Sequence, residues 1–158
     1  MITYNLISAI TMVFSDTTSF LFKNFDGTNQ NWANRNLPSA FFSTDKTAKS
    51  YSELSSGDGM SLLLGSGTTP AVGTDYKLEA IESEYSVIVQ NHNVFTGQYG
   101  NQIMVVNRVI QNISGSPITI NEMGLFGYQI LFAREVLSEP VVLQPGEKHT
   151  FTMTISLE

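Results

Sequence analysis

Residues 58–158 alternate between apolar stretches and turn-forming residues. The pattern is clearest from Phe151 to Leu157, where every second residue is apolar and threonine or serine lies between. This period of two predicts a strand with one buried and one solvent-facing side. Just before it, Gln144-Pro145-Gly146-Glu147 predicts a type II turn, because proline presets φ at the second position and glycine allows a positive φ at the third.

Similar apolar runs recur through the same region. They predict about six strands with turns roughly every 8–14 residues, which is the spacing of a β-sandwich. The runs are 60–64, 85–95, 102–113 and 117–126, then a short alternation in 128–132, followed by 136–143 and 148–158. At most one helical turn is expected, within 43–54. The predicted fold is an all-β, antiparallel β-sandwich of the jelly-roll or Ig-like kind.

Three details refine this prediction. Apolar residues at both parities in 102–113 predict a strand covered on both faces, by another layer or by a neighbouring subunit. The apolar positions change parity at Asn121-Glu122, which predicts a bulge or bend there. Pro140 interrupts the run 136–143 and predicts an edge strand or a bend, because proline cannot donate to a sheet ladder.

Residues 15–57 have a different pattern, rich in Asn, Asp, Gly, Ser and Pro, and we expect irregular structure. Seven aromatic residues in this stretch must either fold back on the body or bury against other subunits: Phe20, Phe22, Phe25, Trp32, Phe41, Phe42 and Tyr51. The apolar stretch 1–14 lacks the basic segment of a signal peptide and is too short to span a membrane, so it predicts a strand or short arm. We therefore expect an N-terminal arm or irregular cap, 1–57, that contacts neighbouring subunits, and a β-sandwich domain, 58–158.

Composition narrows the functional classes. The 158 residues carry a net charge of −6, only 14% are charged and 42% are hydrophobic. An acidic chain lacks the basic footprint of a nucleic-acid-binding protein, and the hydrophobic content excludes a fully disordered chain. The chain has no cysteine, which excludes disulfides, thiolate metal sites and cysteine nucleophiles.

Candidate catalytic groups are sparse. His92 and His149 lack the spacing of metal ligands, and we expect each to face solvent or an interface. No Gly-x-Ser-x-Gly elbow supports a serine nucleophile. The stretch from Gly65 to Thr69 looks like a phosphate loop, yet it lacks the lysine and the following helix, so we expect a flexible corner after a strand.

Oxygen ligands give an equally weak signal. Asp75, Glu79, Glu82 and Glu84 cluster without the spacing of a calcium loop, and we expect a solvated loop face rather than a metal site. Asn112-Ile113-Ser114 matches a glycosylation sequon by pattern only. No catalytic, cofactor-binding or metal-binding residue is therefore predicted, and no cofactor.

Several segments in 58–158 resemble a known family. They are the Gly65-Ser66-Gly67-Thr68-Thr69-Pro70 corner followed by Asp75-Tyr76, the segment Asn121-Glu122-Met123-Gly124-Leu125, and Ala133-Arg134-Glu135-Val136-Leu137 followed by Pro140-Val141 and Pro145-Gly146-Glu147. In this order and spacing, the chain resembles a family of small virion proteins of tailed bacteriophages, described as tail-associated or capsid-associated structural proteins. Residues 1–57 lie outside the resemblance.

The resemblance implies structural work in a virion, and it carries over no catalytic residues. We therefore expect a non-enzymatic component of the head, neck or tail that binds other virion proteins and forms a homo-oligomer, with no nucleic-acid and no membrane partner. A surface with few charges fits this role, because charged residues are depleted in the cores of protein interfaces.

Two other classes stay open. One is a carbohydrate- or receptor-binding β-sandwich module, in which Trp32, Tyr51 or Tyr99 would stack on sugar rings. Loss of glycan binding in a Trp32→Ala variant would favour that class. The other is a small hydrolase, for which the sequence shows no clustered acid, base and nucleophile.

Overall fold

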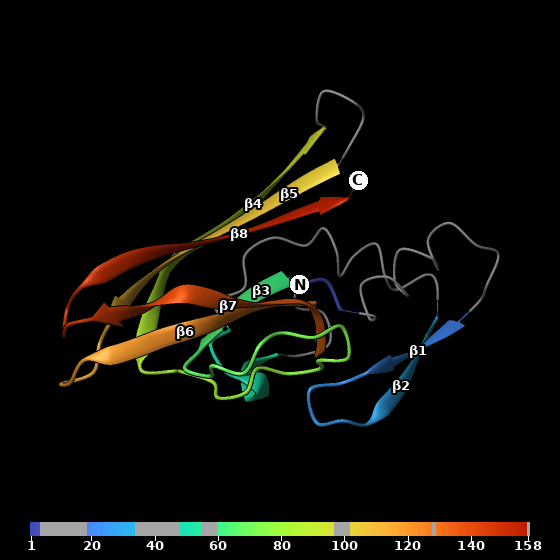
Figure 1. Ribbon diagram of the computed structural model, residues 1–158, viewed down its shortest axis with the longest axis horizontal. Coiled ribbons are helices and arrows are strands. Elements are labelled where there is room, and N and C mark those ends of the chain that lie inside the picture. Colours follow the sequence, from blue (N-terminus) through green and yellow to red (C-terminus); the bar gives the residue numbers. More distant parts are fainter. Residues whose placement is uncertain (4–18, 34–47, 55–59, 97–101, 128, 158) are drawn as a thin grey trace.

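The computed structural model describes residues 1–3, 19–33, 48–54, 60–96, 102–127 and 129–157. Eight strands form two three-stranded antiparallel sheets and one separate hairpin (Figure 1). Their bounds are β1 (Ser19–Lys23), β2 (Asn29–Ala33), β3 (Met60–Gly65), β4 (Tyr85–Thr96), β5 (Gln102–Asn112), β6 (Ile118–Gly127), β7 (Ile130–Leu143) and β8 (Lys148–Leu157). A 3₁₀ turn, Tyr51–Glu53, precedes β3. The predicted all-β sandwich is confirmed.

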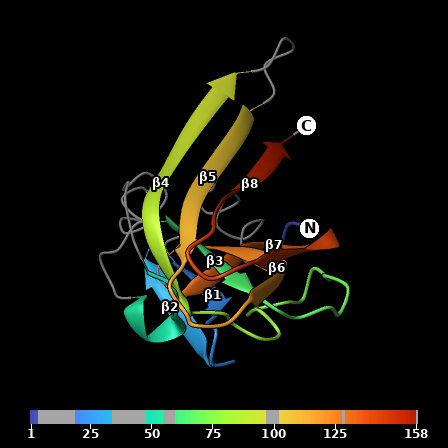
Figure 2. The same cartoon turned by 90° about the vertical axis from the view of Figure 1, so that its left-hand side faces the viewer.

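The two sheets have the strand orders β3-β6-β7 and β4-β5-β8. The chain forms the β4–β5 hairpin in one sheet, crosses to form the β6–β7 hairpin in the other, and returns for β8. Figure 2 shows the sheets packed at an angle, with the far ends of β4, β5 and β8 extending beyond the β3–β6–β7 sheet. The six strands β3–β8 agree with the predicted number.

The main core lies between the two sheets. In β8 the alternation has its predicted effect: Phe151, Met153 and Ile155 are buried, and the threonines between them are exposed. Facing positions of β6 supply Met123 and Leu125. The period of two works here because successive side chains of a strand point to opposite faces.

The crossing between β7 and β8 is the predicted type II turn. Gly146 has φ of +82°, and the Glu147 N–H donates to the Gln144 carbonyl at 3.0 Å. The buried Asn112 at the end of β5 fastens this corner, because its amide donates to the carbonyls of Ser116 and Leu143, both at 2.9 Å. One side chain therefore joins the β5–β6 and β7–β8 crossings between the sheets.

The irregularity predicted at Asn121-Glu122 is also present. The β6–β7 register shifts between Ile120, which faces Val141, and Glu122, which faces Val136. Residues 137–140 of β7 therefore lie opposite Asn121 alone. Pro140 sits in this bulge, and β7 is an edge strand, as the proline predicted.

The prediction for 102–113 holds on one face of β5. Val106, Arg108 and Ile110 are buried toward the other sheet, whereas Val105 and Val109 are partly exposed on the opposite face. Among the described residues, no second layer of this chain covers that opposite face. Cover by a neighbouring subunit stays a prediction.

The prediction of irregular structure in 15–57 is wrong for residues 19–33, where β1 and β2 form an antiparallel hairpin. Its turn contains Gly27, with φ of +85°. Phe22 is buried in the main core, and Asn24 bridges to Ile130, so this part of the arm folds back on the body. The side chains of Phe20 and Trp32, and all of Phe41 and Phe42, lie outside the described residues.

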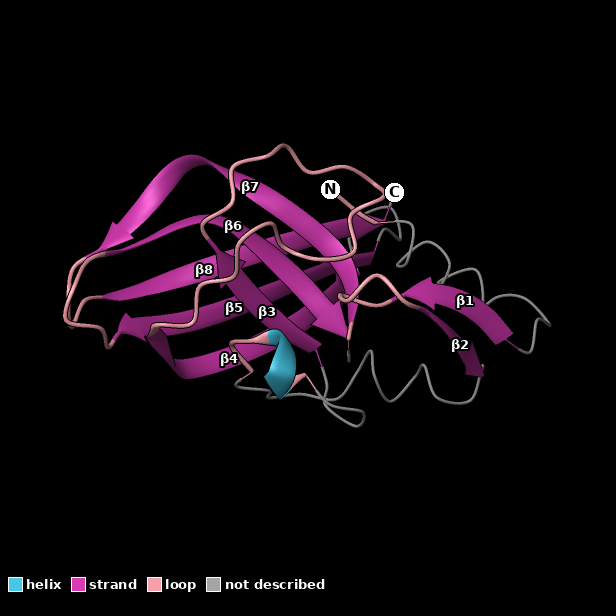
Figure 3. Cartoon of the chain, turned by 90° about the horizontal axis from the view of Figure 1, so that it is seen from below, coloured by secondary structure: helices cyan, strands magenta, loops and turns pink. Residues whose placement is uncertain are grey.

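A second apolar cluster covers the outer face of the β3–β6–β7 sheet. Leu63, Phe126 and Leu131 of the sheet pack against Leu54 and Leu78 from the flanking segments. Figure 3 shows these segments running across that face. The β3–β6–β7 sheet is thus covered on both sides. No helix in the described part of the chain is long and apolar enough to cross a membrane.

Candidate functional site

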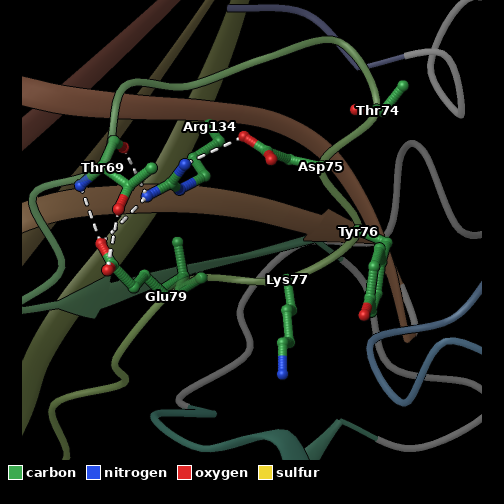
Figure 4. Close-up of a pocket in the computed structure, with 8 residues that line it drawn as sticks. Thr69, Thr74, Asp75, Tyr76, Lys77, Glu79 and Arg134 are labelled. Atoms are coloured by element: carbon green, nitrogen blue, oxygen red, sulfur yellow. Dashed lines mark hydrogen bonds and ion pairs between the residues drawn. The ribbon is translucent and has the colours of Figure 1, made fainter.

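The strongest concentration of charge is a cluster under the loop 66–84, on the outer face of the β3–β6–β7 sheet (Figure 4). Glu122 of β6 and Arg134 of β7 are 0% and 3% exposed. They lie on adjacent strands, and the Arg134 Nε donates to a Glu122 oxygen at 2.7 Å. Asp75 and Glu79 reach the pair from the loop. We call these four residues the ionic cluster.

The Glu122 carboxylate accepts hydrogen bonds from several groups. Besides Arg134, it accepts hydrogen bonds from the backbone N–H groups of Gly67 at 3.1 Å, Ala80 at 2.9 Å and Glu79 at 3.2 Å. A methyl group at Gly67 would overlap the carboxylate, so this close approach requires a glycine. The carboxylate therefore ties both ends of the loop to β6.

Arg134 has a partner for each guanidinium nitrogen. Nη1 donates to Asp75 at 2.9 Å, and Nη2 donates to the Thr69 carbonyl at 3.0 Å. Burial alone would lower the pKa of the guanidinium, but the hydrogen bonds to Glu122 and Asp75 outweigh it and raise the pKa above its usual value. Arg134 stays a fully bound cation.

Glu79 binds the glycine-rich corner itself. It accepts from the backbone N–H groups of Thr68 and Thr69 and from the Thr69 hydroxyl, all at 2.8 Å. The hydrogen bond from the Thr69 backbone is the largest cause that lowers the pKa of Glu79. The corner does follow a strand, as predicted, but its N–H groups hold the protein's own carboxylates. The corner resembles a phosphate loop because its successive backbone N–H groups attract anions, and here the anions are carboxylates of the same chain.

The four acidic residues that are close together in the sequence do not form a single site. Asp75 and Glu79 belong to the ionic cluster, so the prediction of a solvated face is wrong for Asp75, whose side chain is only 19% exposed. Glu82 instead accepts from the N–H groups of Ser83 and Glu84. The described residues contain no group of three or more His, Cys, Asp or Glu side chains placed to hold a metal ion.

An open hollow of about 290 Å³ lies beside the ionic cluster, between Thr69 and Lys77. Tyr76 forms one wall, and the Lys23 ammonium lies 4.5 Å from the centre of its ring. Asp75 and Arg134 reach this hollow joined to each other through Arg134 Nη1 and Asp75 Oδ2, and the other guanidinium nitrogens bind Glu122 and Thr69. The arrangement holds a loop in place, and it offers no unpaired acid–base couple to a substrate.

A second polar group joins the two sheets. Arg108 of β5 is fully buried and donates to the carbonyls of Leu62 and Ala48, the latter at 2.6 Å. Gln90 of β4 accepts from the Leu62 N–H at 2.9 Å and donates to the Met60 carbonyl at 2.7 Å. Burial lowers the pKa of Arg108 and raises that of the neighbouring Tyr85 to about 12.

Sequence reasoning assigned no role to the buried charges Arg108, Glu122 and Arg134. Each is a charged residue in a strand that also contains a run of apolar residues. Charged residues are rarely buried unless paired, so their position next to apolar runs was the available signal. Glu122 was noted at the predicted bulge, and both Glu122 and Arg134 were noted as parts of the resembling segments.

The remaining predicted residues do not join a common site. His149 is exposed, as predicted, with its ring 4.8 Å from that of Phe151, while the side chain of His92 lies outside the described residues. Asn112 is buried and donates both amide hydrogen bonds internally, so the folded chain cannot be glycosylated at this sequon.

Of the aromatic residues considered for sugar stacking, Tyr51 is the one whose side chain the structure describes. Tyr51 stacks on Phe25 with ring centres 4.7 Å apart and contacts Phe126 edge-on at 5.6 Å. Its hydroxyl binds the backbone of Leu78. Tyr99 and the side chain of Trp32 lie outside the described residues. Comparisons with protein-family models, curated proteins and solved structures find no match to this chain.

Proposed function

We propose that this protein is a non-enzymatic structural component of a bacteriophage virion, which assembles with other virion proteins and with copies of itself on the head, neck or tail. The observation that carries the proposal is that residues from the separate resembling segments contact one another in the folded chain. Thr69 from the glycine-rich corner, Asp75, Glu122 and Arg134 come from separate segments and form a single bonded network.

That network has a structural role. Its carboxylates and guanidinium are paired with one another and with backbone groups, so they fasten the loop 66–84 to the sheet. A catalytic acid or base would instead need a polar atom within reach of a substrate. The residues that carry the resemblance therefore support a rigid body rather than a reaction centre.

The surface of the other sheet supports the same proposal. The outer face of β4–β5–β8 carries mostly uncharged residues, among them Val89, Asn91, Val105, Val109 and Thr152, with Lys148 at one end of β8. Protein interfaces exclude charge from their cores, so a face with few charges favours contact with other subunits.

Mass spectrometry of density-purified virus particles from the source tests this proposal. We expect peptides of this chain in the particle band, with their abundance scaled to the major capsid protein. Abundance close to that of the capsid protein would assign it to the head, and a few dozen copies or fewer would assign it to the neck or tail. Absence from the particles would overturn the proposal.

A further inference from the structure

The sandwich has four sheet edges, formed by β3, β7, β4 and β8. An open edge presents unpaired N–H and C=O groups that invite another strand, and proteins block such edges with covering segments, charges, prolines or bulges. Comparing the four edges identifies the one that lacks such a block.

The β3 edge is covered along its length. Gln90 and Arg108 reach across from the other sheet to the backbone of Leu62. Further along, Gly65 bridges to Ile81, and the Glu82 N–H donates to the Leu64 carbonyl at 2.9 Å. No further strand can pair there without displacing these contacts.

The β7 edge is also blocked, and the β4 edge is interrupted near one end. Ile2 pairs with Ala133, and the Thr3 N–H donates to the Phe132 carbonyl at 2.9 Å, so the first residues cover one half of β7. The other half contains the bulge at 137–140, with a glutamate and Pro140. In β4, the register shifts between Val87 and Val89 and leaves Ile88 bulged and 49% exposed.

Within the residues that the structure describes, strand β8 itself carries none of these devices. From His149 to Leu157 the strand contains no proline, acid, lysine or arginine, and its register with β5 runs without a shift. No other described strand pairs with it. Consecutive residues Met153–Ser156 line one hollow of about 150 Å³, whose other side is formed by Met1 and Ile2 and by Ala133 and Glu135 of β7. Since these four side chains alternate between faces, the hollow opens on the edge itself.

We propose that the β8 edge pairs with the β8 edge of a second copy of this chain, antiparallel about Met153, to give a continuous six-stranded sheet. This contact specifies one of the subunit contacts of the proposed virion role. It is tested on the purified chain alone, so its failure would leave the virion proposal intact, and the converse also holds.

The strand is self-complementary in this register. Thr152 faces the partner's Thr154, and Phe151 faces the partner's Ile155, so threonine pairs lie on the outer face and apolar pairs on the inner face. Such cross-strand pairs stabilise antiparallel sheets. A twofold contact of this kind is closed and produces a dimer.

Sedimentation of the purified full chain, alone and as charge variants, tests the pairing. We expect a dimer with a Kd of about 1 µM or tighter. In Thr152→Lys/Thr154→Lys, like charges face each other twice across the twofold axis, so the Kd should rise at least about tenfold, even though the net negative charge falls. In Thr152→Lys/Thr154→Glu, each lysine faces a glutamate, and dimerisation should be restored.

A control at the opposite edge separates edge pairing from contact through the sheet face. Asn91→Lys/Asn93→Lys places two lysines on the same outer face of the sheet, on β4. The dimer should persist in this variant. A monomeric wild-type chain would overturn the proposal. So would a dimer that both lysine pairs disrupt equally, or one that neither disrupts.

Disulfide trapping tests the register with small substitutions. Because the chain has no cysteine, Thr152→Cys and Thr154→Cys each introduce a single thiol. A mixture of the two variants should form a cross-linked dimer faster than either variant alone, since residue 152 faces the partner's residue 154. Equal rates in all three samples would exclude pairing about Met153.

Discussion

The β3–β6–β7 sheet is covered on both faces, whereas the β4–β5–β8 sheet packs on the core with one face and presents the other to solvent. In the first sheet, Glu122 and Arg134 lie beneath a loop whose backbone they bind. In the second, the outer face carries threonine, asparagine and valine, with exposed Thr150, Thr152 and Thr154 on β8.

This difference shows that one sandwich can contain two surfaces with different tasks. The charged groups of the covered sheet pair with one another and with the backbone of the loop. They therefore stabilise the fold and are not available to bind a partner. The outer face of the β4–β5–β8 sheet has few charges, with Lys148 at one end. Under the proposed role another protein covers this face and desolvates few charges, a step that is costly unless charges are well paired. On that proposal the first sheet is suited to stability, and the second to contact.

The largest expected effect comes from removing the central carboxylate. Glu122→Ala leaves Arg134 buried without its main partner and three backbone N–H groups without an acceptor, so the free energy of unfolding should fall by about 3–5 kcal/mol. Urea unfolding monitored by circular dichroism measures this change. Glu139→Ala, an exposed acid in the β7 bulge, should change stability by less than about 0.5 kcal/mol.

If Glu122→Ala were as mild as Glu139→Ala, the covered sheet would not depend on its buried charges. The β3–β6–β7 sheet would then be stabilised mainly by its apolar packing.

A smaller effect is expected from a methyl group in the glycine-rich corner. In Gly67→Ala the new Cβ overlaps the Glu122 carboxylate and the Glu79 side chain, so the loop must shift at a cost of about 1–3 kcal/mol. Gly115→Ala is the matched control, because its Cβ would meet no atom within 4 Å. Thermal unfolding of both variants compares them, and equal melting temperatures would contradict the close approach at Gly67.

The smallest expected effect is a change in how stability depends on pH when Glu79 is replaced. The pKa of Glu79 is lowered in the folded chain, chiefly by the hydrogen bond from the Thr69 backbone, so its ionised form contributes stability above its ordinary pKa of 4.5. That contribution is lost as the pH falls through the lowered pKa. Wild type should therefore be more stable than Glu79→Gln at neutral pH, and the difference should shrink as the pH falls below 4.5 through the lowered pKa.

Unfolding of both proteins across this pH range gives the measurement. Glu139→Gln removes one negative charge from an exposed site and separates a general effect of charge from the loss of these hydrogen bonds. A stability difference between wild type and Glu79→Gln that stays constant with pH would contradict the assigned role of the carboxylate.

Local sequence patterns predicted the strands, turns and bulges that depend on neighbouring residues in the chain. Thr150–Leu157 formed the expected half-buried strand, Pro145-Gly146 the expected turn, and the parity change at Asn121-Glu122 the expected bulge. The hairpin at 19–33 was missed, because its second strand, Asn29–Ala33, is polar and lacks an apolar alternation. Its place is set instead by burial of Phe22 in the body.

The sequence by itself determined the strands of the body, since the alternation of side chains along a pleated backbone requires no distant partner. The sequence also limits the charged residues to 14% of the chain. Only the tertiary structure decided which charges meet: Arg134 binds Asp75 across 59 positions of the chain and Glu122 across 12. The physical reason is that ion pairing depends on distance in space, and here the sheet register and the path of the loop 66–84 bring the partners together.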